Sequence, residues 1–195
     1  MLITVIVLLV LIGAVVVVAI LAYNRLIALK GQTENAWKQI DVQLKRRHDL
    51  IPNLINAVKG AMQFERETLE AVVAARSAAI TAAAAATPAT AGQVAAAEGV
   101  LTAALTKFMA IVEAYPDLKA TGNIGQLQEE LASTENRVSF ARQAYNDTAT
   151  DYNITQKQFP ILLLAGLAGA SPAQLWEIAE EADRAVPTVD LSMKK

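Results

Sequence analysis

An uninterrupted apolar segment at residues 2–22 constrains the fold more than any other feature of this sequence. The segment carries no charged side chain, and Thr4 is its one clearly polar residue. In a helix, these 21 residues rise about 31 Å, which matches the roughly 30 Å hydrocarbon core of a bilayer. Tyr23 and Arg25 follow, as an interfacial aromatic and a cationic anchor do at the end of a span. We therefore expect residues 1–23 to be a transmembrane anchor.

A cleaved signal peptide is the alternative interpretation of this segment. Such peptides begin with basic residues and have a shorter apolar core, whereas no Lys or Arg precedes residue 25 here. We therefore favour a retained single-pass anchor. Arg25, Lys30 and Lys38 follow the span, and this bias favours a cytoplasmic C-terminal domain, with a periplasmic or extracellular domain as the second choice.

The overall charge and the residue inventory exclude several classes of function. Seventeen basic and 19 acidic residues give a net charge of −2, which argues against nucleic-acid binding by bulk charge. The sequence has no cysteine, one histidine, no glycine-rich phosphate loop and no Gly-x-Ser-x-Gly motif. No Glu-x-x-His pair accompanies its glutamates, so a carboxylate-bridged metal site in a bundle is not expected. We predict no catalysis, no metal, no cofactor and no small-molecule substrate.

Beyond residue 24 the sequence has the periodicity of helices. Apolar residues recur every three or four positions, and prolines divide the chain into long segments. The most regular segment alternates steps of four and three for more than four heptads, with hydroxyl-bearing residues that suggest a bundle seam. These features predict an all-α protein in which an N-terminal transmembrane helix precedes a long antiparallel four-helix bundle at residues 24–160. The seam is Leu127, Leu131, Thr134, Val138, Ala141, Tyr145, Thr148, Tyr152, Thr155 and Phe159.

The first boundary in the bundle is expected near Pro52. Asp49 is a plausible N-cap for a new helix whose first turn tolerates Pro52. Thr87 and Pro88 similarly predict the start of the third helix. Four antiparallel helices would return the chain to the membrane after Phe159. If Pro52 only kinks one continuous helix, three long helices would leave the later residues far from the membrane.

Residues 161–195 should hold an apolar, membrane-proximal segment, a short helix that starts at Ser171 and Pro172, and a tail. The apolar run after the fourth helix is uncharged and too short to span a bilayer. Such a run is typical of a contact with lipid or with another protein. Its candidate membrane or oligomer contacts are Phe159, Ile161, Leu162, Leu163, Leu164 and Leu167.

The densest charge cluster precedes the expected break at Pro52. There it would lie at the membrane-distal tip of the bundle, either as a binding site for a protein partner or as a solvated helix end with cations near its C-terminus. The histidine of the cluster falls on the apolar stripe, where a bond to a neighbouring helix is the simplest interpretation. The candidate partner-binding residues are Lys45, Arg46, Arg47, His48 and Asp49.

Several longer motifs also occur in a fixed order. They include Tyr23-Asn24-Arg25-Leu26, Asn35-Ala36-Trp37-Lys38-Gln39-Ile40, His48-Asp49-Leu50-Ile51-Pro52-Asn53-Leu54, Tyr115-Pro116-Asp117-Leu118, Leu127-Gln128-Glu129-Glu130-Leu131 and Tyr145-Asn146-Asp147. Over residues 23–160 the chain resembles the LemA family of bacterial membrane proteins. The resemblance implies an N-terminally anchored antiparallel four-helix bundle in the bacterial inner membrane, with no assigned reaction or cofactor. Similar proteins often carry phenylalanines where this chain has Gly166-Leu167-Ala168-Gly169-Ala170.

These features together predict a non-enzymatic, membrane-anchored helical scaffold. It would act by self-association or by docking partners at the bilayer, since anchoring concentrates chains in two dimensions. The alternative is an adaptor that regulates a specific envelope enzyme or sensor through the membrane-distal tip. The expected partners are membrane lipid, further copies of the chain and an envelope protein.

Overall fold

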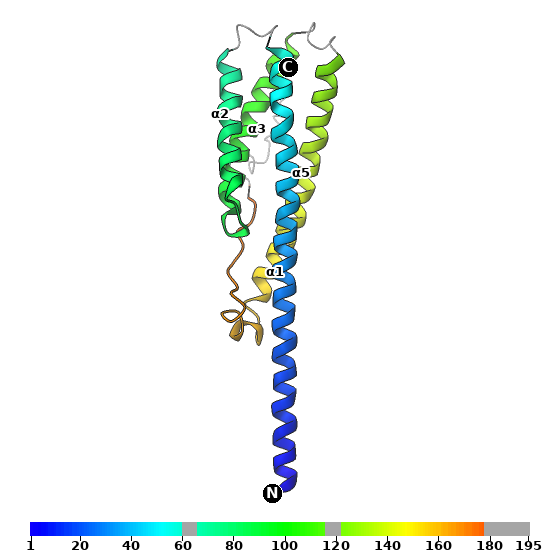
Figure 1. Cartoon of the computed structure of the whole chain (residues 1–195), viewed down its shortest axis with the longest axis vertical. Coiled ribbons are helices and arrows are strands. Elements are labelled where there is room, and N and C mark those ends of the chain that lie inside the picture. Colours follow the sequence, from blue (N-terminus) through cyan, green and yellow to red (C-terminus); the bar gives the residue numbers. More distant parts are fainter. Residues whose placement is uncertain (60–65, 116–121, 178–195) are drawn as a thin grey trace, which may run out of the picture.

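The computed structural model describes residues 1–59, 66–115 and 122–177, and all of its regular elements are helical (Figure 1). Helix α1 packs along α5, and α2 packs along α3, so that the two pairs form an antiparallel four-helix bundle. This architecture confirms the predicted fold class. The elements are α1 (Leu2–Val58), α2 (Arg66–Ala84), the 3-10 turn η1 (Pro88–Thr90), α3 (Ala91–Glu113), α5 (Gly122–Thr155) and the 3-10 turn η2 (Ile161–Leu163).

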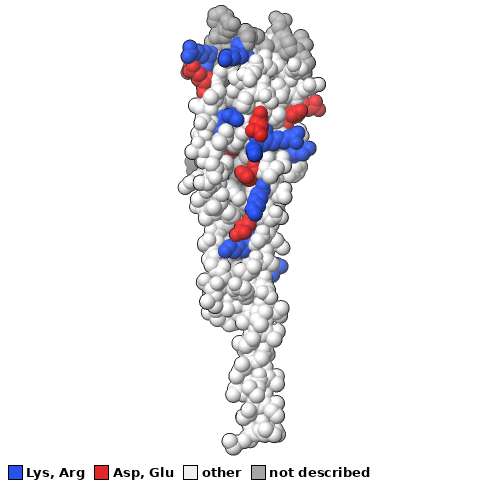
Figure 2. Space-filling view, viewed as in Figure 1, with Lys and Arg blue, Asp and Glu red and all other residues white. Residues whose placement is uncertain are grey.

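Helix α1 joins the apolar N-terminal segment to the bundle without interruption. Almost every side chain from residue 2 to residue 21 is exposed, and burial against other elements begins at Ala22. The view in Figure 2 shows no charged side chain on this part of α1, which lies at the bottom of the picture. By length and composition, both α1 and a stretch of η1 and α3 (residues 88–113) could cross a membrane. Helix α3 buries its apolar face in the bundle, so α1 is the candidate for an anchor or a signal sequence.

The predicted helix boundary at Asp49 is wrong, because α1 continues through Pro52 to Val58. A proline inside a helix cannot donate to the carbonyl four residues earlier, which here belongs to His48. The side chain of Arg76 on α2 supplies that donor, with Nε 2.7 Å from the His48 carbonyl oxygen. The helix therefore continues past Pro52, and the described residues still form four long helices, because α1 ends at Val58 and α2 begins at Arg66.

The junction between α2 and α3 confirms the predicted helix start. Thr87 and Thr90 form a reciprocal capping box around η1, and Pro88 occupies its first turn. The amide of Thr87 donates to the Thr90 hydroxyl over 2.9 Å. Thr87 thereby fixes the reversal between the two helices.

Two apolar clusters make up the core of the bundle. The cluster nearer the apolar segment runs along α1 from Ala22 to Leu44 and includes Trp37, whose ring meets that of Tyr145 edge-on with centroids 5.3 Å apart. The Tyr145 hydroxyl donates to the carbonyls of Pro88 and Gln174, and burial raises its pKa to about 12. The distal cluster comprises Ile51, Leu54, Val58, Val72, Ala75, Ala79, Leu101, Leu105, Phe108, Val112, Ile124 and Leu131.

The seam on α5 and the return of the chain agree with the four-helix prediction. Val138, Tyr145 and Tyr152 are buried, whereas Phe159 lies beyond the helix and is exposed. Residues 161–170 lie beside α1 at the end of the bundle next to the apolar segment, so the alternative with a remote tail is wrong (Figure 1). The predicted short helix does not start at Ser171, because residues 170–177 are not helical. Its remaining residues lie outside the described part of the chain.

Candidate functional site

A buried polar layer separates the two core clusters in the middle of the bundle. The guanidinium of Arg47 on α1 meets the carboxylate of Glu98 on α3, with Nη1 and Oε2 2.9 Å apart, and both side chains are 4% exposed. Nε2 of the neighbouring His48 lies 2.6 Å from the other oxygen of the same carboxylate. One carboxylate thus binds two adjacent residues of α1.

A second carboxylate and a hydroxyl complete the layer. Nη2 of Arg47 lies 2.9 Å from Oε2 of Glu135 on α5, and it also donates to the Thr102 hydroxyl over 2.8 Å. The Thr102 hydroxyl in turn donates to the Glu98 carbonyl. With Arg76 bound to the His48 carbonyl, all four helices contribute to this layer.

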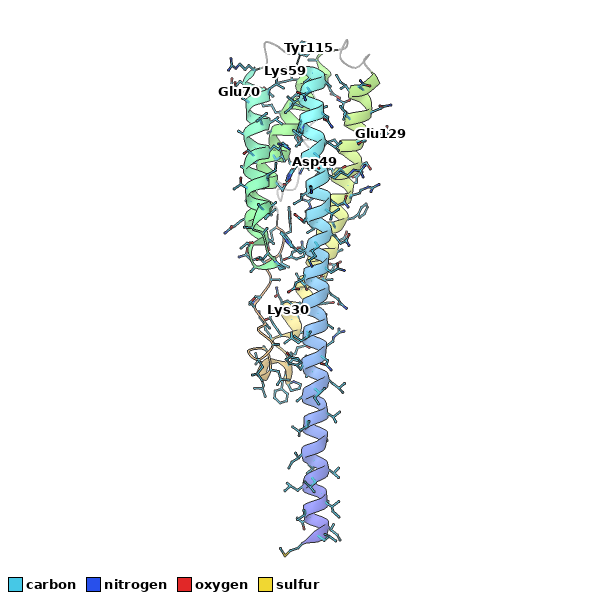
Figure 3. All side chains as sticks on the ribbon, in the orientation of Figure 1. Lys30, Asp49, Lys59, Glu70, Tyr115 and Glu129 are labelled. Carbon is cyan, nitrogen blue, oxygen red and sulfur yellow. The ribbon has the colours of Figure 1, made fainter. Side chains whose placement is uncertain are left out.

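The layer corrects the predicted position of the charge cluster at residues 45–49. Figure 3 shows Asp49 in the middle of the bundle, while Lys59 and Tyr115 lie at its far end. The helix runs nine residues beyond Asp49, or about 14 Å. These residues are therefore not a solvated helix end. The simplest interpretation of His48, a buried histidine bonded to a neighbouring helix, is confirmed.

The geometry of the layer suits a structural role better than a chemical one. Buried ion pairs that satisfy each other can set the register of packed helices. The Thr102 hydroxyl already accepts one hydrogen bond and donates another, so it is not free to act as a nucleophile for His48. In the described part of the chain, no group of three or more His, Cys, Asp or Glu side chains could hold a metal ion.

A groove between α1 and α2 lies next to the polar layer. It has a volume of about 520 Å³, and the alanine-rich end of α2 leaves it open because the side chains there are small. The groove brings Lys45, His48 and Asp49 together with Trp37, whereas Arg46 is exposed elsewhere and Arg47 is buried in the layer. The predicted cluster is therefore divided between groove, surface and interior.

The second candidate site lies at the end of the bundle next to the apolar segment of α1. Ile161 is buried and Leu164 is partly buried against the core. The Nζ of Lys30 donates to the Gly169 carbonyl over 3.2 Å. Four large apolar side chains of this segment face away from the protein. They are Phe159, Leu162, Leu163 and Leu167.

Two asparagines, which sequence reasoning missed, hold the chain after this segment. Asn153 accepts from the Ala173 amide and donates to its carbonyl, over 2.9 and 2.7 Å. Asn146 binds the amide and carbonyl of Trp176 in the same way, over 2.8 and 3.0 Å. Both lie on α5, seven residues apart, so together they hold the non-helical segment around residues 173–176 against the helix.

Glu98 is another residue that sequence reasoning missed. It lies four residues after Val94 and three before Leu101, on the buried stripe of α3. A carboxylate at such a position requires a buried partner. Arg47 and His48 fall on the buried stripe of α1. The pairing of Glu98 with these two residues therefore had a signal in the sequence.

The chain is similar to several known proteins. A family model described as the LemA family matches residues 36–191. Magnetosome protein MamQ 2 of Paramagnetospirillum magneticum is 22% identical over 91% of this chain and 73% of its own length. Protein LemA of Metamycoplasma hominis is 26% identical over 67% of this chain and 57% of its own length.

Proposed function

Since this chain belongs to the LemA family, we propose that it is a membrane-anchored helical scaffold that acts by self-association at the bilayer. The observation that carries this proposal is the continuity of α1, which extends as one helix from the apolar segment to the distal end of the bundle. A bundle on such a support is held at a fixed distance from the membrane. Anchoring raises its local concentration, so weak lateral contacts suffice.

The outer surface of the bundle supports lateral association. Val42 on α1 and Phe140 on α5 are large apolar side chains that remain mostly exposed. Exposed apolar groups on neighbouring chains gain from mutual burial. The ionic groups of the interior are paired with each other, which favours a non-catalytic role.

Light scattering on the full chain in mild detergent tests the scaffold. A multimer is expected, and Val42→Ser combined with Phe140→Ser should shift it towards smaller species. Val73→Ser is a matched control, because Val73 is also exposed but lies on α2. A strictly monomeric protein, both in detergent and by cross-linking in membranes, would refute self-association.

An adaptor for an envelope enzyme or sensor is the second candidate. A groove of about 680 Å³ between α1 and α2 lies at the membrane-distal end and supports this function. Ile55 and Leu69 give it an apolar floor, while Lys59, Arg66 and Glu70 supply charge. Lys59→Glu with Arg66→Glu should abolish a stoichiometric cross-linked partner and leave the multimer unchanged. The partner should survive the reversal Arg46→Glu, which lies outside the groove.

For the location, we propose the bacterial inner membrane with the bundle in the cytoplasm. The support for this side is the Lys and Arg bias after the apolar segment, with Arg25, Lys30 and Lys38 beyond it. Protease treatment of intact cells and of inverted vesicles tests it. We expect cleavage of the bundle in inverted vesicles alone. Cleavage in cells whose outer envelope has been made permeable to the protease would place the bundle on the periplasmic or extracellular side.

A further inference from the structure

The segment that follows α5 exposes an unusual amount of apolar side chain. Phe159 is 81% exposed, Leu162 55%, Leu163 70% and Leu167 80%. All four lie within nine consecutive residues, and residues 159–170 contain no charge. Contiguous apolar surface of this kind marks a site of contact with a membrane or another protein.

The position of this segment along α1 identifies the membrane as the partner. Ile161 and Ala168 belong to the same core cluster as Ala22, the last residue of the apolar span. Lys30 binds the carbonyl of Gly169. The segment therefore lies beside α1 near Lys30, at the end of the bundle that faces the apolar span (Figure 1). Lys30 is eight residues from Ala22, an axial distance of about 12 Å. The polar zone of one leaflet is about 5–8 Å thick, so the part of the segment nearest the apolar span lies at the bilayer surface.

The backbone of the segment is suited to a lipid environment. Polar groups without water must find partners within the protein. The amide of Leu162 donates to the Gln158 carbonyl over 2.7 Å, and that of Leu164 donates to Ile161 over 2.8 Å. The amides of Ala168 and Ala170 donate to Leu164 and Ala165, each over 3.0 Å. Successive turns thus pair several of the segment's amides within the protein, while the side chains of Leu162, Leu163 and Leu167 are exposed.

Flanking cations support the same orientation. Lys157 precedes the segment and is exposed, and Arg25 is exposed just beyond the span. Long cationic side chains extend towards phosphate groups while their stems cover apolar surface. These positions match lipid headgroups on the outer side of an inserted apolar patch.

We propose that Phe159, Leu162, Leu163 and Leu167 insert into the surface of the bilayer that holds α1. This proposal rests on the anchoring of α1. It adds a second attachment to the membrane, which follows α5 in the sequence, whereas the anchor precedes the bundle. The occupant of the patch is lipid, not a second protein. Two separate attachments limit the tilt and the rotation of the bundle relative to the membrane more than one helix does.

Single-cysteine labelling tests this insertion, because the natural chain has no cysteine. Leu163→Cys and Leu167→Cys carry an environment-sensitive fluorophore in the full chain, reconstituted into vesicles of phosphatidylcholine and phosphatidylglycerol. Val10→Cys reports on the span, and Val100→Cys, 62% exposed on α3, is the control on the bundle. Lipids with a spin label in the acyl chain quench only labels that touch lipid.

The expected result is strong quenching at residues 10, 163 and 167, several-fold above that at residue 100. Quenching at residue 10 without quenching at 163 and 167 overturns the insertion and leaves the anchor intact. Labels at 163 and 167 that are shielded from aqueous iodide but not quenched by lipid indicate a protein partner and also overturn it. Absence of quenching at residue 10 refutes the anchor itself, and the insertion with it.

Discussion

Replacing Arg47 with methionine removes the guanidinium that both Glu98 and Glu135 bind in the buried layer. The aliphatic stem is kept, so the change isolates the charge. Glu98 remains almost fully buried with His48 as its neighbour, while Glu135 is partly exposed and can be hydrated. Breaking a buried ion pair by removing one partner costs about 3–5 kcal/mol. For a domain of this size, that corresponds to a fall in melting temperature of about 6–20 °C.

Circular dichroism of the full chain in detergent measures this fall. Arg66→Met is the matched control, because Arg66 forms a surface ion pair with Glu70 in which both side chains are mostly exposed. Such a pair contributes little to stability, because solvent screens both charges. The double variant Arg47→Met with Glu98→Gln should regain about 1–3 kcal/mol over the sum of its single variants, since no unpaired charge is left inside.

Two results would refute this reasoning. One is a loss for Arg47→Met no greater than that for Arg66→Met, which would mean that water reaches the layer freely. The other is strict additivity in the double variant, which would mean that Arg47 and Glu98 do not depend on each other for stability.

Three further predictions concern the packing around α5 and the path of α1. Tyr145→Phe should cost about 1–3 kcal/mol, because the Gln174 carbonyl loses the hydroxyl that donates to it, whereas the Pro88 carbonyl keeps the Gln174 amide as a donor. Because folding raises the Tyr145 pKa to about 12, the native chain should also lose stability as the pH rises from about 10 to 12, and urea midpoints of the Phe variant should lack this drop. Asn146→Ala should free the backbone of Trp176, and a red shift of tryptophan emission with easier iodide quenching would report it. Arg76→Met should cost about 1–2 kcal/mol in the native chain and less in a Pro52→Ala background, where a new amide takes over the orphaned carbonyl; equal costs in both backgrounds would contradict the role given to Arg76.

The sequence predicted those parts of the fold that depend on periodic burial. Val138, Tyr145 and Tyr152 fall on one stripe because a helix turns by a fixed angle per residue, and the structure buries all three. The capping residues at Thr87 and Pro88 act locally, so they too were visible in the sequence. Local rules and periodicity together were enough for a four-helix bundle.

The errors arose where a distant residue overrides a local rule. Pro52 should end a helix, but Arg76, 24 residues later, replaces the lost donor. Because of this error, residues 45–49 are predicted at the tip of the bundle, whereas α1 reaches the tip only at Val58. Likewise, Arg47 was interpreted as exposed charge because its partner Glu98 is 51 residues away. Pairings between helices are set by the tertiary arrangement, which no single-helix pattern encodes.

The unbroken course of α1 has a mechanical consequence. From Ala22 to Val58 the helix measures about 54 Å, so a change of about 10° in the inclination of the span displaces its far end sideways by roughly 9 Å. With α1 anchored as proposed above, bilayer thickness affects that inclination, since a span longer than the hydrocarbon core leans over to fit. A rod of this kind converts a change of a few ångströms in lipid thickness into a movement large enough to bring neighbouring bundles together or apart.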